Sequence, residues 1–182
     1  MGLAGTVPTL LITGPGGVGK TTVAHEVCRQ LQAADVAHAM IDTDELDRVY
    51  PPPGGDPHKT DLTRRNLAAV WSNLRDAGAP RLILTMVAVS LSDELANIRE
   101  AIPEARIVAV RLYASEDALL ERVRRREVGS GYGHQAPRSI GQSRVMGREC
   151  GGDRSVVDTT ARSVPETARE VLDHARRSAG FW

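Results

Sequence analysis

The chain has 182 residues, and its 23 basic and 23 acidic side chains give a formal net charge of zero. That length suits one domain with a sizeable core, and the balanced charge offers no overall field that would attract nucleic acid or an anionic membrane. No run of 18 apolar residues occurs, so the sequence predicts no membrane-spanning helix.

Two features bear on the cellular compartment. The two cysteines, Cys28 and Cys150, are far apart and do not predict a disulfide framework. The first residues lack the basic and apolar regions of a secretory signal, and we interpret their match to the loose N-myristoylation pattern as a short leader. We therefore expect a cytoplasmic protein, and the sequence leaves its oligomeric state open.

The first predicted elements are a buried strand at residues 9–13, a glycine-rich segment at 14–21 and a helix from residue 22. The glycine-rich segment fits the pattern G-x-x-x-x-G-K-[ST], which binds phosphate when a strand precedes it and a helix follows it. Val23, Val27 and Leu31 recur at helical spacing, which supports the helix. The segment is therefore predicted to bind the phosphates of a nucleotide.

The residue types in this segment suit phosphate binding. Glycines let backbone N–H groups approach phosphate closely, and the N-terminus of the following helix attracts negative charge. Lys20 adds a positive charge near the β- and γ-phosphates, and the Thr21 hydroxyl is the expected Mg²⁺ ligand. The predicted nucleotide contacts are Gly14, Pro15, Gly16, Gly17, Val18, Gly19, Lys20, Thr21 and Thr22. The alternative interpretation is a glycine-rich turn whose lysine is merely exposed.

The next predicted elements are a strand at about 37–41, which ends in Asp42-Thr43-Asp44, and a helix at about 61–77. Between them the proline- and glycine-rich residues 51–57 predict a loop. The helix has a repeating apolar face that should pack on the sheet, and Trp71 on that face is predicted to be a core residue.

Three further elements follow: a strand at 81–89, a helix at 93–101 and a strand at 106–112. Ser115 then supplies a hydroxyl cap for a helix that runs into a dense group of arginines. The group consists of Arg122, Arg124, Arg125 and Arg126.

Residues 127–148 contain repeated glycines and Pro137, which leave little expectation of regular structure. A loop of that length in a compact domain is typical of a lid or binding element. A short strand at 155–158 and a final helix complete the chain. Ser163 and Glu166 have the spacing of a capping box at the start of that helix, and Pro165 suits its first turn. Strands alternating with helices predict one α/β domain over residues 1–182, with a parallel sheet covered by helices.

Four segments together resemble the small P-loop kinases, a group that includes shikimate, gluconate, adenylylsulfate and adenylate kinases. These segments are the glycine-rich loop 14–22, the acidic pair of 42–44, the arginines of 122–126, and residues 157–160 with the capping box. The resemblance implies a three-layer α/β/α P-loop NTPase fold with a five-stranded parallel sheet in the order 2-3-1-4-5. It also implies a glycine-rich lid at about 127–148 and an acceptor-binding region at about 45–66.

The resemblance implies roles for the two aspartates that follow the second strand. Asp42 would hold a Mg²⁺-bound water, so that Thr21 and Asp42 are the expected metal residues, and Asp44 would orient the acceptor hydroxyl or take its proton. Positioning and charge neutralisation carry most of the catalysis of phosphoryl transfer, which suits such a pair. The alternative is that the aspartates only cap a helix.

The resemblance also implies that Arg122 stacks on adenine and that Arg126 reaches the phosphates. Lys20, Asp42, Asp44 and Arg126 then form the expected catalytic set. The alternative for the arginines is that they complement the dipole of their own helix end. Arg138, Arg144 and Arg148 are further candidates for entering the site from the lid, and no spacing selects among them.

Some motifs of individual kinases are missing from the sequence. Residues 85–89 stand where shikimate kinases have a glycine run, and no Asn-Lys-x-Asp motif for guanine is present. We therefore expect an ATP-dependent kinase that uses Mg²⁺ and moves the γ-phosphoryl group to a hydroxyl or phosphate of a small metabolite, without a nucleic-acid or membrane partner. The alternatives are a nucleoside monophosphate or adenylylsulfate kinase, and a nucleotide-binding regulatory module with little turnover.

Overall fold

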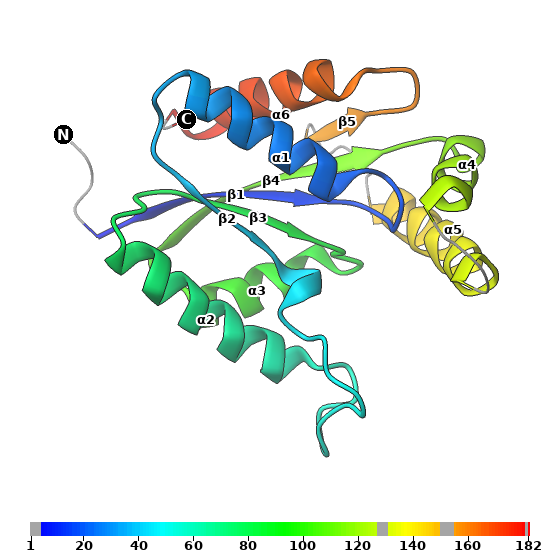
Figure 1. Cartoon of the computed structure of the whole chain (residues 1–182), viewed down its shortest axis with the longest axis horizontal. Helices are drawn as coiled ribbons and strands as arrows, with labels where there is room; N and C mark the ends of the chain where they lie inside the picture. Colours follow the sequence, from blue (N-terminus) through cyan, green and yellow to red (C-terminus); the bar gives the residue numbers. More distant parts are fainter. Residues whose placement is uncertain (1–4, 127–130, 150–154, 181) are drawn as a thin grey trace.

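A five-stranded, entirely parallel sheet forms the centre of the computed structural model, which describes residues 5–126, 131–149, 155–180 and 182. The strands are β1 (Val7–Thr13), β2 (Ala39–Asp42), β3 (Leu82–Met86), β4 (Ala105–Tyr113) and β5 (Val156–Asp158). Their order is β2-β3-β1-β4-β5 (Figure 1), which confirms the order that the resemblance implied.

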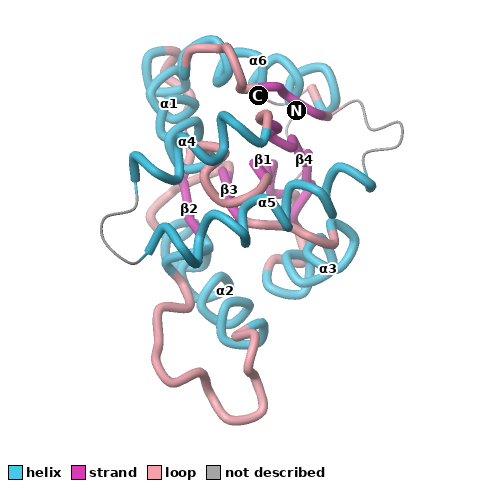
Figure 2. Tube along the Cα trace, turned by 90° about the vertical axis from the view of Figure 1, so that its right-hand side faces the viewer, coloured by secondary structure: helices cyan, strands magenta, loops and turns pink. Residues whose placement is uncertain are grey.

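Helices cover both faces of this sheet. Helices α1 (Lys20–Ala33) and α6 (Val164–Ala179) lie on one face, and α2 (Thr60–Asp76) and α3 (Leu91–Ala101) lie on the other (Figure 1). Helices α4 (Glu116–Arg126) and α5 (Gly131–Glu149) stand in front of the carboxyl ends of the strands, as Figure 2 shows, and the 3₁₀ helix η1 (Thr43–Glu45) follows β2. The predicted three-layer α/β/α architecture is therefore confirmed.

The central strand β1 has apolar residues on both of its faces because both faces are covered. Leu10 and Ile12 belong to the core beneath α1 and α6, whereas Leu11 belongs to the core beneath α2 and α3. Successive side chains of a strand point to opposite faces, so a strand buried on both sides needs a continuous apolar run. Trp71, which is 3% exposed, lies in the α2/α3 core as predicted.

The predicted helix caps are also present. The Ser163 hydroxyl accepts a hydrogen bond from the Glu166 backbone, and the Glu166 carboxylate accepts one from the Ser163 backbone, which completes the capping box of α6. At the start of α4, the Ser115 hydroxyl accepts from the backbone N–H of Ala118 at 3.3 Å. Both caps satisfy backbone N–H groups that have no partner within the helix.

Helix α5 contradicts the expectation of an irregular segment at 127–148. Residues 131–149 form a helix despite their glycines and Pro137, while residues 127–130 lie outside the described part of the chain. Ala136, Ser139 and Met146 are buried, and the Met146 carbonyl accepts a hydrogen bond from the Arg111 side chain at 2.6 Å. These contacts with distant residues outweigh the weak helical preference of the local sequence.

The structure describes one of the two cysteines. Cys28 packs against the α1/α6 core, and burial raises the pKa of its thiol to about 11, so it acts as a small packing residue. Cys150 and residues 1–4, where the sequence predicts a short leader, lie outside the described residues. In the part of the chain that is described, no helix is both long and apolar enough to cross a bilayer.

Candidate active site

The loop between β1 and α1 requires glycine at two positions. Gly14 has φ +148° and Gly17 has φ +80°, conformations that residues with a Cβ rarely adopt. A Cβ at Gly14 would lie 2.7 Å from the Leu112 carbonyl oxygen, and one at Gly17 would lie 2.7 Å from a methyl carbon of Val123. The loop therefore packs too closely against β4 and α4 to admit a side chain at either position.

Lys20 is the first residue of α1, and its side chain is buried beside the loop. It is 6% exposed, and its Nζ donates a hydrogen bond to the Pro15 carbonyl at 3.3 Å. Burial lowers the pKa of the ammonium group, and the carboxylates of Asp44 and Asp42 act against that shift. The site therefore holds a desolvated positive charge, which a bound polyphosphate would stabilise.

Thr21 and Asp42 meet at the edge of the sheet. The Thr21 hydroxyl donates to the Asp42 carboxylate with an oxygen–oxygen distance of 2.7 Å. The other Asp42 oxygen accepts from the backbone N–H of Asp44 at 3.1 Å, so Asp42 also caps η1. Asp42 therefore caps η1 with one oxygen while its other oxygen stays in contact with Thr21, so capping does not exclude a metal role.

These two residues fit the donor set that Mg²⁺ uses in nucleotide sites. Mg²⁺ prefers oxygen ligands and takes only one or two from the protein, the rest coming from phosphate and water. The described residues contain no group of three or more His, Cys, Asp or Glu that would hold a metal by themselves. Thr21 and Asp42 would hold the ion only together with a bound nucleotide.

Asp44 lies on the wall of a large cavity that Lys20 also lines. Its carboxylate is reached by solvent, but the cavity walls surround it, and this partial desolvation is the main cause of its raised pKa. The neighbouring carboxylates of Asp42 and Asp47 raise the pKa further, whereas Lys20 and Arg138 lower it. Asp44 is thus a more basic carboxylate than an ordinary aspartate.

The cavity has a volume of about 1470 Å³ and opens at the carboxyl ends of the strands. In open α/β sheets this edge is where ligands bind. Of the predicted nucleotide contacts, residues 16–22 line the cavity, whereas Gly14 and Pro15 are buried behind it. Asp42 does not line the cavity, but its carboxylate accepts a hydrogen bond from Thr21, which does.

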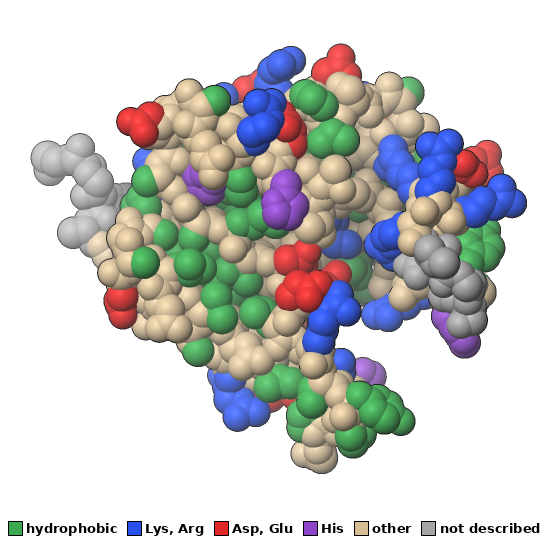
Figure 3. Space-filling view, viewed as in Figure 1, with side chains coloured by type: hydrophobic (Ala, Val, Ile, Leu, Met, Phe, Trp, Pro, Cys, Tyr) green, Lys and Arg blue, Asp and Glu red, His purple; other side chains and the backbone are tan. Residues whose placement is uncertain are grey.

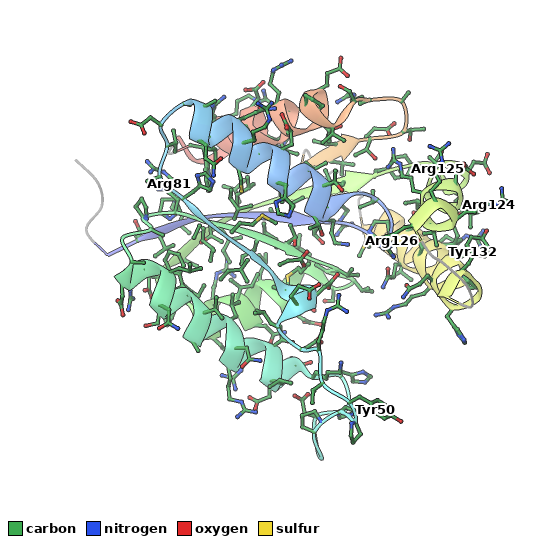
Figure 4. The ribbon with its side chains drawn as sticks, in the orientation of Figure 1. Tyr50, Arg81, Arg124, Arg125, Arg126 and Tyr132 are labelled. Atoms are coloured by element: carbon green, nitrogen blue, oxygen red, sulfur yellow. The ribbon has the colours of Figure 1, made fainter. Side chains whose placement is uncertain are left out.

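Arg122 connects the glycine-rich loop with the segment after β5. Its guanidinium donates to the Val18 carbonyl at 3.0 Å and to the hydroxyl and carbonyl of Thr159 at 2.8 and 2.7 Å. Figure 4 shows Arg126 on the side of α4 that faces the loop, and Arg124 on the outer side. Arg126 lines the cavity and lowers the pKa of Lys20, so it contributes positive charge to the loop's side of the cavity.

Helix α5 brings residues to the site that sequence reasoning missed. The Ser139 hydroxyl donates to the Gly16 carbonyl, and the Gln142 side chain accepts from the Gly16 N–H at 2.9 Å. Arg138 lines the cavity and acts electrostatically on Asp44. No sequence signal identifies Ser139 or Gln142, because their partner lies more than a hundred residues away.

The structure distinguishes between two of the three arginines that the sequence left equivalent. Arg144 forms a two-pronged ion pair with Glu116 at 2.8 and 2.9 Å and does not line the cavity, whereas Arg138 does. The side chain of Arg148 is outside the described part of the chain.

Comparison with known proteins gives one matching family. Residues 10–145 match the family described as "AAA domain", and this range includes the glycine-rich loop, both aspartates and most of α5. No curated protein matches the sequence.

Several solved structures share the fold. A gluconokinase from Sinorhizobium meliloti 1021 is 21% identical, with a TM-score of 0.60 over 95% of this chain and 94% of that one. A shikimate kinase from Acinetobacter baumannii, solved with shikimate, is 19% identical, with a TM-score of 0.56 over 96% of each chain. An APS kinase from Mycobacterium tuberculosis, solved with AMPPNP and APS, is 21% identical, with a TM-score of 0.57 over 93% of this chain and 97% of that one. At these identities the likeness establishes the fold alone.

Proposed function

Since the chain belongs to the AAA domain family and has the fold of small P-loop kinases, we propose that it is an ATP-dependent kinase. It would transfer the γ-phosphoryl group of ATP to a hydroxyl group of a small metabolite. The observation that carries this proposal is one cavity lined by the glycine-rich loop, by Lys20 and by Asp44. A site that only binds nucleotide has no need of a basic carboxylate facing the phosphate-binding loop.

Each residue has a role that follows from its chemistry. The amides of the loop and the Lys20 ammonium group would hold the β- and γ-phosphates. Arg122, held by Val18 and Thr159, would present the flat face of its guanidinium to the adenine. Arg126 and Arg138 would neutralise charge on the transferring group, and Mg²⁺, held by Thr21 and Asp42, would supply further neutralisation when bound.

Asp44 would take the proton of the acceptor hydroxyl. As the acceptor oxygen bonds to the γ-phosphorus, the bond from that phosphorus to the β–γ bridging oxygen breaks, and ADP leaves with the electron pair. The proton on Asp44 then passes to solvent, which restores the carboxylate. Aligned placement of the two reactants accounts for much of the rate, and the raised pKa of Asp44 suits it to the proton transfer.

A direct test of nucleotide binding is titration calorimetry with ATP and Mg²⁺ on the wild type and on Lys20→Ala. The variant should bind ATP about 10- to 100-fold more weakly, because it lacks a charge-assisted contact with phosphate. Lys59→Ala is the matched control, since Lys59 is the other lysine of the chain and donates to the Asp47 carbonyl away from the loop. Equal ATP affinity in Lys20→Ala and wild type would contradict the assignment of the loop.

Transfer itself is tested by ADP release and mass spectrometry across a panel of sugars, cyclitols, amino alcohols, nucleotides and antibiotics. A phosphorylated acceptor with faster ADP release supports the kinase. A protein that binds ATP but accelerates ADP release with no compound would instead be a nucleotide-binding regulatory module. Phosphorylation restricted to nucleoside monophosphates or adenylylsulfate would identify the remaining alternative.

A further inference from the structure

The half of the cavity that faces away from the glycine-rich loop has its own chemical character. Its wall is formed by the segment after η1, the first turns of α2, the residues after β3, and α3. In the proposed kinase this half receives the acceptor, and the inference below rests on that proposed function.

The floor of this acceptor wall is apolar. Leu67 of α2, Met86 at the end of β3 and Ile98 of α3 line the cavity and belong to the α2/α3 core. Val87 and Val89 continue the apolar surface beyond β3, and Val89 is 37% exposed. Such a surface favours a ligand with a hydrocarbon body over a fully hydroxylated sugar chain.

Each described lysine and arginine on the acceptor wall is accompanied by a carboxylate. Arg48 donates twice to Glu45, with both distances 2.6 Å. Lys59 lies 3.9 Å from an Asp47 carboxylate oxygen. The field of these cations is therefore cancelled locally, although exposed pairs of this kind add little to stability.

Arg64 is also paired with carboxylates. It pairs with Asp61 one turn earlier on α2, and its Nε lies 3.6 Å from a Glu100 oxygen on α3. A phosphate or carboxylate on the acceptor would meet no lysine or arginine without a nearby carboxylate among the described residues of this wall, and His58 is the other basic side chain that lines it.

Glu94 has no cationic partner in the described part of the chain. It is half-buried in the first turn of α3, lines the cavity, and accepts a weak hydrogen bond from the Asn97 side chain at 3.4 Å. Glu94 therefore gives the wall a carboxylate without a cationic partner, whereas Asp44 lies within the electrostatic influence of Lys20 and Arg138. Carboxylate oxygens that lack a partner favour an ammonium group or hydroxyl donors on the ligand.

The loop's half of the cavity has the opposite character. Lys20, Arg122, Arg126 and Arg138 line it. Figure 3 shows Lys and Arg side chains gathered over α4 and α5, and Asp and Glu side chains gathered near η1. The polyphosphate and the acceptor thus meet opposite electrostatic environments within one cavity.

From this separation of charge we infer that the acceptor is an amino alcohol with an apolar ring or chain, carrying neither phosphate nor carboxylate. Its ammonium group would pair with Glu94, its hydrocarbon body would lie on the Val87 and Val89 surface, and its hydroxyl would face Asp44. This assignment disfavours nucleoside monophosphates and adenylylsulfate as acceptors, because both are anionic.

Four probes with controlled charge test the inference: an aminocyclohexanol, a cyclohexanediol, a hydroxycyclohexanecarboxylate (each with its two groups on opposite ring carbons) and AMP. Binding is measured without nucleotide, from NMR shifts of the Val87, Val89 and Asn97 amides, so the result does not depend on turnover. The amino alcohol should bind about fivefold or more tightly than the hydroxy acid, as one partly buried ion pair provides. Mass spectrometry with ATP and Mg²⁺ then tests whether the amino alcohol is phosphorylated.

Glu94→Gln keeps the shape of the side chain and removes its charge, so the variant should lose the preference for the amino alcohol while binding the diol as the wild type does. Asp93→Asn is the matched control, because Asp93 is an exposed acid on the same turn that does not line the cavity. The inference is overturned if the hydroxy acid or AMP binds as tightly as the amino alcohol, if no probe shifts these amides, or if the two variants behave alike. Selective binding of the amino alcohol without phosphorylated product would support the ligand class and contradict the kinase.

Discussion

Asp44 is subject to opposing electrostatic influences. Desolvation and two neighbouring carboxylates raise its pKa more than Lys20 and Arg138 lower it. A base must be ionised to accept a proton, so turnover should fall as the pH decreases through this raised pKa. The carboxylate also costs stability, because the folded protein binds the proton more tightly than the unfolded chain, and stability from this group decreases as the pH rises through the same range.

Asp44→Asn should therefore lower kcat by about 100-fold or more with the best acceptor, leave ATP affinity near that of the wild type, and remove the acid limb of the pH–rate profile. At neutral pH its melting temperature should not fall, since the substitution removes a desolvated charge. Steady-state kinetics over a range of pH, together with thermal denaturation, measures these effects.

Asp47→Asn provides the informative control. Asp47 raises the pKa of Asp44, so its removal should move the acid limb to lower pH while kcat on the plateau is retained. Wild-type turnover in Asp44→Asn would exclude the proposed role of Asp44.

At the scale of single residues, the sequence predicts functional groups only where the pattern is local. Lys20 and Thr21 belong to a contiguous motif, so a phosphate-binding role could be predicted for both without a structure. Gln142 could not, because its hydrogen bond to Gly16 depends on how α5 packs. Glu94 is a candidate ligand-binding residue only because it has no cationic partner in the described structure. The spacing of residues in the sequence does not reveal that absence.

Among the elements, α5 shows where local preference fails. Its glycines and Pro137 predict a loop, yet buried residues on one side and two hydrogen bonds to Gly16 stabilise a helix. The strands and the capped helices were predictable because their signals, an apolar run or a capping box, lie within the element itself. An element whose stability comes from tertiary contacts gives no such signal.

The contact between α5 and the glycine-rich loop has a testable consequence for nucleotide binding. Gln142→Ala removes the acceptor of the Gly16 N–H, so the loop should be less well ordered and ATP should bind about two- to tenfold more weakly. Calorimetric titration with ATP and Mg²⁺ measures the change. His134→Ala, at an exposed position of the same helix, should leave the affinity as it is, and equal affinities for Gln142→Ala and wild type would show that α5 does not organise the loop.

For the molecule as a whole, alternating strands and helices predicted the parallel sheet, and the strand order followed from the resemblance. The identity of the acceptor could not be predicted from the sequence. The acceptor wall is assembled from α2, α3 and the residues after β3, and the charge of this wall depends on which of its side chains form ion pairs. Residues 14–22 form one continuous motif, whereas the residues of the acceptor wall come from separate segments and form no motif.

The two cores on either face of one sheet predict a single cooperative unfolding transition. Leu10 and Leu11 are neighbours in β1 but pack into different cores, so neither core can be lost while the other remains intact. Differential scanning calorimetry should give equal calorimetric and van't Hoff enthalpies. Two separate transitions would contradict the prediction of one domain over residues 1–182.

ATP with Mg²⁺ at about 100 times its Kd should raise the melting temperature by about 5 to 10 °C, and by less when EDTA is present.

The hydrogen bonds of Arg122 join Val18, near the start of the chain, to Thr159, which follows the last strand. A ribosome that has completed β1, α1 and even α4 has therefore not yet produced the partner that holds this guanidinium. The nascent polypeptide therefore carries the 14–22 motif well before Arg122 can join that motif to the segment after β5.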